Sequence, residues 1–248
     1  MSEKANYGID APNVVRNSIV AGVGLVIVGV ALWYLPLPDS LWRLHRIAPS
    51  LGASGISCLF CASVMLWGSK AGKLHLRDKI LAGLIWRGDE QVLDVGCGHG
   101  LMLIGAAKHL TTGKATGIDI WQTEDQADNS EKATQANIDC EGVTSKVVLH
   151  SADARAMPFA DESFDLILSS WAIHNIYVKE ERAKALTEMM RVLKPEGKIV
   201  IADIRHGSEY ALAFRRGGMV NLRRSLPNFL FVIPTMTISA QKPKRPAT

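Results

Sequence analysis

The positions of hydrophobic and polar residues divide the chain into two unlike parts. Residues 17–38 include no charged side chain, and a second uncharged run covers residues 47–69. Beyond residue 87, short apolar runs alternate with longer amphipathic stretches. The first part therefore predicts two long apolar helices, and the second predicts strands that alternate with helices.

Five apolar runs in the second part predict buried parallel strands, because they are short, rich in β-branched residues and bounded by Gly, Asp or Pro. They cover residues 92–95, 115–118, 147–149, 166–168 and 199–201. Helices are expected between them, over residues 101–110, about 129–141 and 179–193. This alternation predicts an α/β fold with a doubly wound, mostly parallel sheet.

The end of the chain departs from the simple alternation. A short helix is expected over residues 208–216, followed by two extended runs, 219–226 and 229–240. Pro227 and Asn228 separate the two runs, which predicts a β-hairpin of two edge strands, one of them antiparallel to the rest of the sheet.

Residues 92–100, which read Val-Leu-Asp-Val-Gly-Cys-Gly-His-Gly, predict a ligand-binding loop. Gly96, Gly98 and Gly100 remove the Cβ atoms where a strand turns into a helix, so that the backbone can approach a ligand closely. The third glycine comes one residue too early for a dinucleotide fingerprint. Asp94 precedes the first glycine, and an acid at this place favours a cationic ligand over a phosphate.

This loop resembles motif I of the class I S-adenosylmethionine-dependent methyltransferases. The resemblance continues in Thr-Gly-Ile-Asp-Ile at 116–120, His-Ser-Ala-Asp-Ala-Arg-Ala-Met-Pro-Phe at 150–159, Ser-Phe-Asp-Leu-Ile-Leu-Ser-Ser at 163–170 and the segment 191–203. It covers about residues 88–203. The subgroup that includes ubiquinone and menaquinone C-methyltransferases is the most similar, although a substrate does not follow from that.

The resemblance implies a seven-stranded Rossmann-like sheet and S-adenosylmethionine as the cofactor. Asp119, at the tip of the second strand, is placed to accept hydrogen bonds from two ribose hydroxyls. By the resemblance, Asp153 faces the adenine amino group and Ala154 lies against the ring. The residues expected at the cofactor are Asp94, Gly96, Cys97, Gly98, Gly100, Asp119, Ile120, Asp153, Ala154 and Ser169.

The segment after the fourth strand, Ser-Ser-Trp-Ala-Ile-His-Asn at 169–175, is expected to face the methyl acceptor. It has neither the Asn/Asp-Pro-Pro-aromatic motif of nucleic-acid amino-methyltransferases nor the acid that catechol methyltransferases use to hold magnesium. His174 is a candidate general base for a phenol, enol or thiol, and the alternative is that it caps the strand or packs beneath the cofactor. Trp171 suits the wall of a pocket for a lipophilic acceptor.

Two further features leave alternatives open. The acid-rich segment 121–130 is either a lid or a solvated loop with a helix N-cap at Asn129 or Ser130. Cys58 and Cys61 have no other cysteine or histidine near them in sequence to complete a zinc site, so no metal is expected.

The two N-terminal apolar runs predict a membrane hairpin, with helices over about 17–36 and 48–68. Helices of this length cross a hydrocarbon core of about 30 Å. Small residues at Gly22, Gly29, Ala53 and Ser57 would let them pack closely. The alternatives are a cleaved signal peptide for the first run and an amphipathic or buried helix for the second.

Charge suggests an orientation and a class of partner. Residues 70–87 hold five basic side chains against one acid, so the positive-inside rule places the catalytic domain in the cytoplasm. Of the net charge of +4, residues 1–87 contribute +5 and residues 88–240 contribute −4. A mildly acidic catalytic domain argues against a nucleic-acid partner.

These expectations define an organisation and a function. Residues 1–69 are a membrane anchor, 70–87 a basic juxtamembrane linker or helix, 88–241 the methyltransferase domain and 242–248 a basic tail that is either solvated or bound to lipid. The expected function is methyl transfer to a small lipophilic acceptor at a membrane. The alternatives are the same catalysis on a soluble small molecule or a protein, and a membrane subunit that binds the cofactor without catalysis.

Overall fold

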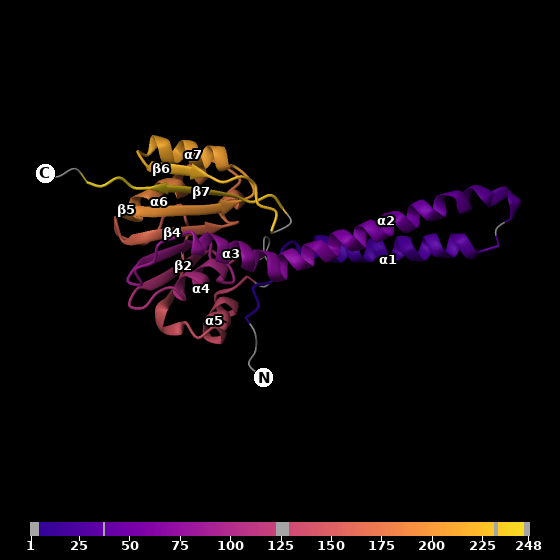
Figure 1. The fold of residues 1–248 in the computed structure, drawn as a ribbon, viewed down its shortest axis with the longest axis horizontal. Helices are drawn as coiled ribbons and strands as arrows, with labels where there is room; N and C mark the ends of the chain where they lie inside the picture. Colours follow the sequence, from indigo (N-terminus) through magenta and orange to yellow (C-terminus); the bar gives the residue numbers. More distant parts are fainter. Residues whose placement is uncertain (1–4, 37, 123–128, 231–232, 246–248) are drawn as a thin grey trace.

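The computed structural model describes residues 5–36, 38–122, 129–230 and 233–245, and it shows an α/β domain from which a pair of long helices projects (Figure 1). The domain is built on a seven-stranded sheet in the order β3-β2-β1-β4-β5-β7-β6. The strands are β1 Gln91–Val95, β2 Lys114–Asp119, β3 Val147–Ser151, β4 Phe164–Ser170, β5 Leu193–Asp203, β6 Val220–Arg224 and β7 Met236–Gln241.

The pairing of the strands confirms the predicted doubly wound sheet. Strands β1 to β5 run parallel, and β7 is antiparallel to both of its neighbours, β5 and β6. Each of the five predicted parallel strands lies within an observed one. The carboxyl ends of β1, β2, β4 and β5 therefore meet at one edge of the sheet, where α/β proteins of this topology bind their ligands.

Helices cover both faces of the sheet, as the alternating pattern predicts. Helix α4 (Leu101–Ala107) and helix α5 (Glu131–Cys140) contribute to the hydrophobic core on one face. Helix α6 (Lys179–Val192) and helix α7 (Gly207–Arg216) contribute to the core on the other. The hydroxyl of Ser130 accepts a hydrogen bond from the amide of Ala133, which confirms Ser130 as the N-cap of α5.

The C-terminal hairpin exists, but its connection is longer than the two residues predicted. Strand β6 ends at Arg224 and β7 begins at Met236. Among the described residues, which leave out 231 and 232 of the predicted run, one isolated bridge, Asn228 to Thr235, lies between them. The apolar residues of this stretch were predicted as strand because alternation and β-branching cannot distinguish a paired strand from an apolar loop.

Both N-terminal helices form, and both begin earlier than predicted. Helix α1 covers Pro12–Tyr34, and α2 covers Trp42–Trp67. A π-helical turn (Gly68–Gly72) joins α2 to α3 (Lys73–Ala82) in one continuous helix. The predicted bounds followed the uncharged runs, whereas a helix needs no apolar side chain to continue, and α2 includes Arg43 and Arg46.

Small residues bring the two helices into close contact, as predicted for Gly22 and Gly29. A Cβ atom on Gly22 would lie 2.8 Å from Cγ of Leu59, and one on Gly29 would lie 2.9 Å from the carbonyl oxygen of Ala48. The prediction was wrong for the second helix, because Ala53 and Ser57 are exposed and the contacts come from Ala48, Gly52 and Gly55. Both helices are long and apolar enough to cross a membrane, and most of their surface is exposed.

The N-terminal segment 5–10 lies against the α/β domain rather than with the apolar helices. The amide of Asn6 donates to Oδ1 of Asn137, and Nδ2 of Asn137 donates back to the carbonyl oxygen of Asn6. Lys73 is buried and its ammonium donates to the carbonyl oxygens of Tyr7 and Gly8. Burial lowers the pKa of Lys73, and the nearby Asp10 carboxylate opposes that shift. Lys73 is thus a structural residue rather than part of a basic surface.

The C-terminal segment packs at the opposite end of the domain from the helix pair (Figure 1). The ammonium of Lys242 donates to the carbonyl oxygens of Met190 and Leu193, close to the start of β5. The described part of the basic tail therefore lies far from the apolar helices, which does not support a shared lipid surface.

Candidate active site

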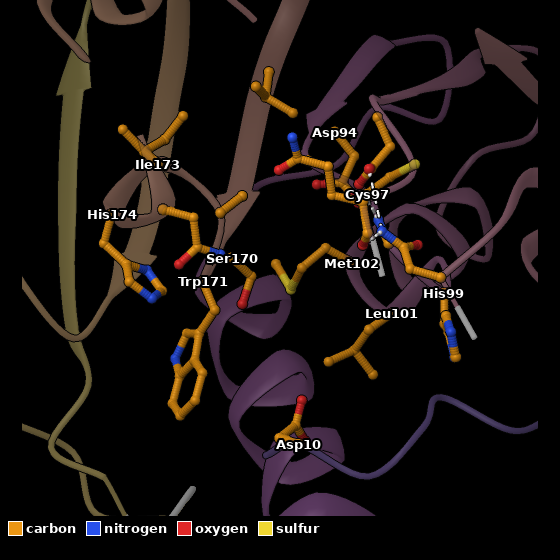
Figure 2. Close-up of a pocket in the computed structure, with 18 of the residues that line it drawn as sticks. Asp10, Asp94, Cys97, His99, Leu101, Met102, Ser170, Trp171, Ile173 and His174 are labelled. Atoms are coloured by element: carbon orange, nitrogen blue, oxygen red, sulfur yellow. Dashed lines mark hydrogen bonds between the residues drawn. The ribbon is translucent and has the colours of Figure 1, made fainter. Parts of the chain in front are cut away.

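The carboxyl edge of the sheet encloses a cavity of about 1040 Å³. It is lined by the loops that follow β1 to β5, by α3, and by the domain-facing ends of α1 and α2. Figure 2 shows His174 and Trp171 on one side of this cavity and Asp94 and Cys97 on the other. The fold therefore brings most of the predicted site residues together in one place.

The glycine loop after β1 needs its glycines for backbone conformation. Gly96, Gly98 and Gly100 have φ angles of 70°, 48° and 82°, in the left-handed region. A Cβ atom on Gly96 would also clash with Cβ of Ala172. Gly96 and Gly98 line the cavity, whereas Gly100 begins α4 and does not line it.

Asp94, at the end of β1, is 1% exposed and lines the cavity. Neither carboxylate oxygen makes a well-formed hydrogen bond with another described residue, although the backbone amide of Leu103 lies near enough to favour the ionised form. Burial, with a smaller contribution from the charge of Asp119, raises the pKa of Asp94 to about 7. A buried carboxylate without a well-formed hydrogen bond favours a cationic ligand, and the ammonium group of an amino-acid tail fits this requirement.

Cys97 lies beside Asp94 in the glycine loop and is also buried. Burial, followed by the charge of Asp94, raises the pKa of the Cys97 thiol, so the side chain stays neutral. Its role at the cavity is therefore that of a wall and not that of a nucleophile.

Asp119, at the end of β2, is held by the backbone around it. Its Oδ2 accepts from the amide of Gly98 at 2.8 Å, and its Oδ1 accepts from the amide of Trp121 at 2.7 Å. Asn129 Nδ2 lies 3.3 Å from the same Oδ1. A carboxylate has about four acceptor positions, so at least one lone pair remains for a ribose hydroxyl. Residues 123–128 of the acid-rich segment lie outside the described residues.

Three other predicted cofactor residues, Ile120, Asp153 and Ala154, line the cavity. The Asp153 carboxylate pairs with the guanidinium of Arg155, which holds the pKa of Asp153 below its usual range. The structure does not support Ser169 as a cofactor residue. Ser169 is buried, its hydroxyl donates to the carbonyl oxygen of Val95 at 2.8 Å, and its neighbour Ser170 lines the cavity instead. Successive residues of a strand point to opposite faces, so a shift of one position changes what a side chain meets.

His174 faces the cavity, and a buried carboxylate lies behind it. Nδ1 of His174 lies 2.6 Å from Oδ1 of Asp203, which is fully buried at the end of β5. The two atoms are close enough for an ion pair. The direction from Nδ1 to the oxygen does not suit a hydrogen bond from an Nδ1–H group. An imidazole in this position can accept a proton at Nε2 while the carboxylate stabilises the resulting charge.

Asp203 is held in place by three further donors. The amide of His174 and the hydroxyl of Tyr210 donate to Oδ2 at 3.1 Å and 3.0 Å, and the amide of Ile204 donates to Oδ1 at 2.8 Å. Burial and the charge of Asp203 raise the pKa of Tyr210, so the phenol remains a donor. The sequence did not predict that Asp203 would lie beside His174. The available signal was an acid just after a predicted parallel strand.

The indole ring of Trp171 lies on the same side of the cavity as His174 (Figure 2). Its backbone is in the left-handed region, with φ of 55°, which is uncommon for a bulky residue. The backbone amide donates to Ala202, and the indole Nε1–H donates to the hydroxyl of Thr235 at 3.1 Å. The ring forms a wall of the cavity, as predicted.

The fold and the cavity agree with comparisons to known proteins. Residues 93–201 match the family model described as a methyltransferase domain. The sheet order, the glycine loop after β1 and the acid after β2 make the α/β domain similar to the domains of class I S-adenosylmethionine-dependent methyltransferases. A solved S-adenosylmethionine-dependent methyltransferase from Aquifex aeolicus has the same fold, with a TM-score of 0.54 and 20% identity over 69% of this chain and 93% of that one.

Two curated relatives illustrate the range of known activities. The chain is 30% identical over 129 residues to 27-O-demethylrifamycin SV methyltransferase of Amycolatopsis mediterranei, covering 52% of this chain and 44% of that one. It is 32% identical over 130 residues to demethylmenaquinone methyltransferase of Lactiplantibacillus plantarum, covering 52% of this chain and 51% of that one. The chain thus spans about half the length of these relatives.

Proposed function

We propose that this protein is a membrane-anchored, S-adenosylmethionine-dependent methyltransferase that methylates a small lipophilic acceptor from the cytoplasmic face. One observation carries the proposal. The cavity that begins at the glycine loop extends to the domain-facing ends of both apolar helices, where Pro12, Val14, Met65 and Ser69 line it. An acceptor dissolved in the bilayer would meet the cavity at this end.

The helix pair supports the membrane part of the proposal. Helix α1 has 23 residues, and at 1.5 Å per residue it is about 34 Å long, enough to cross a hydrocarbon core. A core helix of a soluble protein buries most of its apolar side chains, whereas Val20, Ile27 and Phe60 are each more than 60% exposed. Close contact at glycines is the packing that membrane helices use.

The cofactor-binding part of the proposal assigns one group to each carboxylate. Asp94 would bind the ammonium of the amino-acid tail, Asp119 the ribose hydroxyls and Asp153 the adenine amino group. For Asp153 this requires a lone pair that is left over from the pairing with Arg155. Each of the three lines the same cavity.

The chemical part of the proposal gives His174 the role of general base. Bound S-adenosylmethionine supplies an electrophilic methyl group, so the acceptor needs a nucleophilic atom. His174 would take the proton from a hydroxyl of the acceptor, and Asp203 would stabilise the imidazolium. Trp171 and Ile176 offer apolar walls for the body of the acceptor. The rifamycin and menaquinone relatives, whose named substrates are small molecules, are consistent with this class of acceptor.

Methyl transfer from radiolabelled S-adenosylmethionine into membranes that carry the protein tests this proposal. Asp119→Ala is the control, because loss of the ribose contacts removes cofactor binding. Label in the organic extract that disappears in the control is the expected result. Label confined to water-soluble or protein fractions would contradict a lipophilic acceptor, and no label above the control would favour a subunit that binds the cofactor without catalysis.

A further inference from the structure

The loop between β6 and β7, described at residues 225–230 and 233–235, exposes large apolar side chains at Leu226 and Phe229 that do not line the cavity. Leu226 is 87% exposed and Phe229 is 65% exposed. Pro227 lies between them, and Leu230 follows. Exposed apolar residues scattered singly are normal, but several within one short loop indicate a contact with an apolar partner.

The loop is held against the base of the helix pair (Figure 1). The carbonyl oxygen of Leu230 lies so close to Gly72 that a Cβ atom there would clash with it. The bridge between Asn228 and Thr235 closes the loop, with backbone hydrogen bonds of 2.8 Å and 2.9 Å. Thr235 in turn accepts the indole N–H of Trp171. The loop therefore connects the helix base to the wall of the cavity.

The charges of the helices place this loop at the level of a membrane surface. Arg16 is the last charged residue before the apolar run of α1, and Lys70 is the first after that of α2. Both are exposed. Gly72, which contacts the loop, is only two residues beyond Lys70, or about 3 Å along a helix. Trp67 is half-exposed and lies near the end of the apolar run, three residues before Lys70. A tryptophan at this position suits the interfacial layer of a membrane.

Basic side chains lie on the elements that carry or contact the loop. Arg223 faces the opposite edge of the sheet, where it lines a pocket with Ile85, and does not contribute. Arg224 ends β6 directly before the loop, and it is exposed, as are Arg16 and Lys70 on the helices. This combination fits a bilayer with anionic head groups better than it fits the apolar surface of another protein.

We propose that the β6–β7 loop is a second membrane contact, in which Leu226 and Phe229 insert into the head-group layer on the domain side of an anionic bilayer. The proposal rests on the membrane anchoring proposed above. Because Ile233 of the same loop lines the cavity, the inserted loop forms one wall of the opening through which a lipid-dissolved acceptor enters. The helix pair would then hold the domain at the membrane surface, and the loop would fix the tilt of the domain relative to that surface.

Fluorescence quenching by spin-labelled lipids tests this contact in the full chain. The accessible cysteines Cys58, Cys61 and Cys140 are first replaced by serine, while Cys97 is buried and stays unlabelled. A bimane label is then placed by Phe229→Cys, and the protein is reconstituted in vesicles of phosphatidylcholine and phosphatidylglycerol. Cofactor binding by each labelled variant checks that it is folded.

Two matched sites make the result specific. Ile85→Cys is the aqueous control, because Ile85 is 95% exposed at the opposite edge of the sheet, and Val28→Cys reports on the middle of α1. Lipid with a nitroxide near the head group should quench the label at position 229 severalfold more than that at position 85. Equal quenching at 229 and 85, with strong quenching at 28 by a deep nitroxide, would overturn the loop contact alone. No quenching at 28 would overturn the anchor and, with it, the loop contact.

Discussion

Nδ1 of His174 lies 2.6 Å from Oδ1 of Asp203; His174 lies in the segment after β4, and Asp203 is the last residue of β5. Asp203 is fully buried and receives hydrogen bonds from Tyr210 and from two backbone amides. Three donors thus fix a single carboxylate behind one imidazole. Such an arrangement orients a histidine for proton transfer.

His174→Ala should lower kcat by about a hundredfold or more, because general-base catalysis contributes on this scale. Asp203→Asn should lower kcat as well, since an amide cannot stabilise the imidazolium. Turnover assays and calorimetric titration with S-adenosylmethionine check both variants. Unchanged cofactor affinity is expected for His174→Ala. A loss of affinity with normal kcat would instead assign His174 to packing beneath the cofactor.

Asp94 should make cofactor affinity depend on pH. Its pKa in the folded protein is about 7, above the ordinary value near 4. The cation binds the ionised form, so the contribution of Asp94 to affinity should grow as pH rises through 7. Calorimetry at several pH values measures this change, and Asp94→Asn should bind more weakly and lose that part of the pH dependence. An equal pH dependence in the variant would contradict the assignment.

The same group affects stability in the opposite direction. The folded state holds Asp94 in its protonated form up to about pH 7, whereas the unfolded chain releases the proton near pH 4. The free energy of unfolding of the cofactor-free protein should therefore fall between these values, relative to Asp94→Asn. Thermal denaturation of both proteins in detergent across this range gives the comparison. Parallel curves would show that Asp94 ionises freely in the fold.

Lys73 should be needed to hold the N-terminal segment against the domain. Lys73→Met leaves two carbonyl oxygens and the Asp10 carboxylate without their donor. We expect a loss of about 2 kcal/mol of stability, allowing for the partial exposure of Asp10. Thermal denaturation measures it. Lys70→Met, at an exposed position three residues away, is the matched control and should change little.

Gly55 should be needed for the contact between the two apolar helices. A Cβ atom at Gly55 would lie 2.7 Å from the carbonyl oxygen of Gly22, while one at Gly24 would meet nothing within 4 Å. Gly55→Ala should therefore destabilise the helix pair by about 1 to 3 kcal/mol, and Gly24→Ala should not. Proteolysis of the helix pair in detergent compares the two variants. Equal protection would mean that the helices do not pack as described.

The sequence was sufficient to predict the sheet and most of the residues that line the cavity around the glycine loop. Buried parallel strands are continuous apolar runs, and the glycine loop requires conformations that few other residues adopt, so both leave a local signal. The positions of Asp94 and Asp119 were predictable because each residue lies at the carboxyl end of a strand that its own neighbouring residues predict.

Features that depend on contacts between distant segments were not predictable in this way. Asp203 gains its role only because the fold brings it beside His174, 29 residues earlier. Segment 5–10 has no apolar pattern that points to Asn137, and Lys73 looks in sequence like any other basic residue near a membrane helix. Ser169 was predicted at the cofactor, whereas its neighbour Ser170 lines the cavity, because a shift of one position in a strand reverses the direction of the side chain.

The central claim is that the acceptor reaches the cavity from the bilayer, and surface dilution tests it most directly. The full chain is reconstituted with a fixed amount of lipid extract from its own membranes as the acceptor source, and inert phosphatidylcholine is added. If the acceptor enters from the bilayer, the rate of methyl transfer falls as its mole fraction in the membrane falls, although its bulk concentration is constant. A rate that depends only on the bulk concentration would contradict the claim.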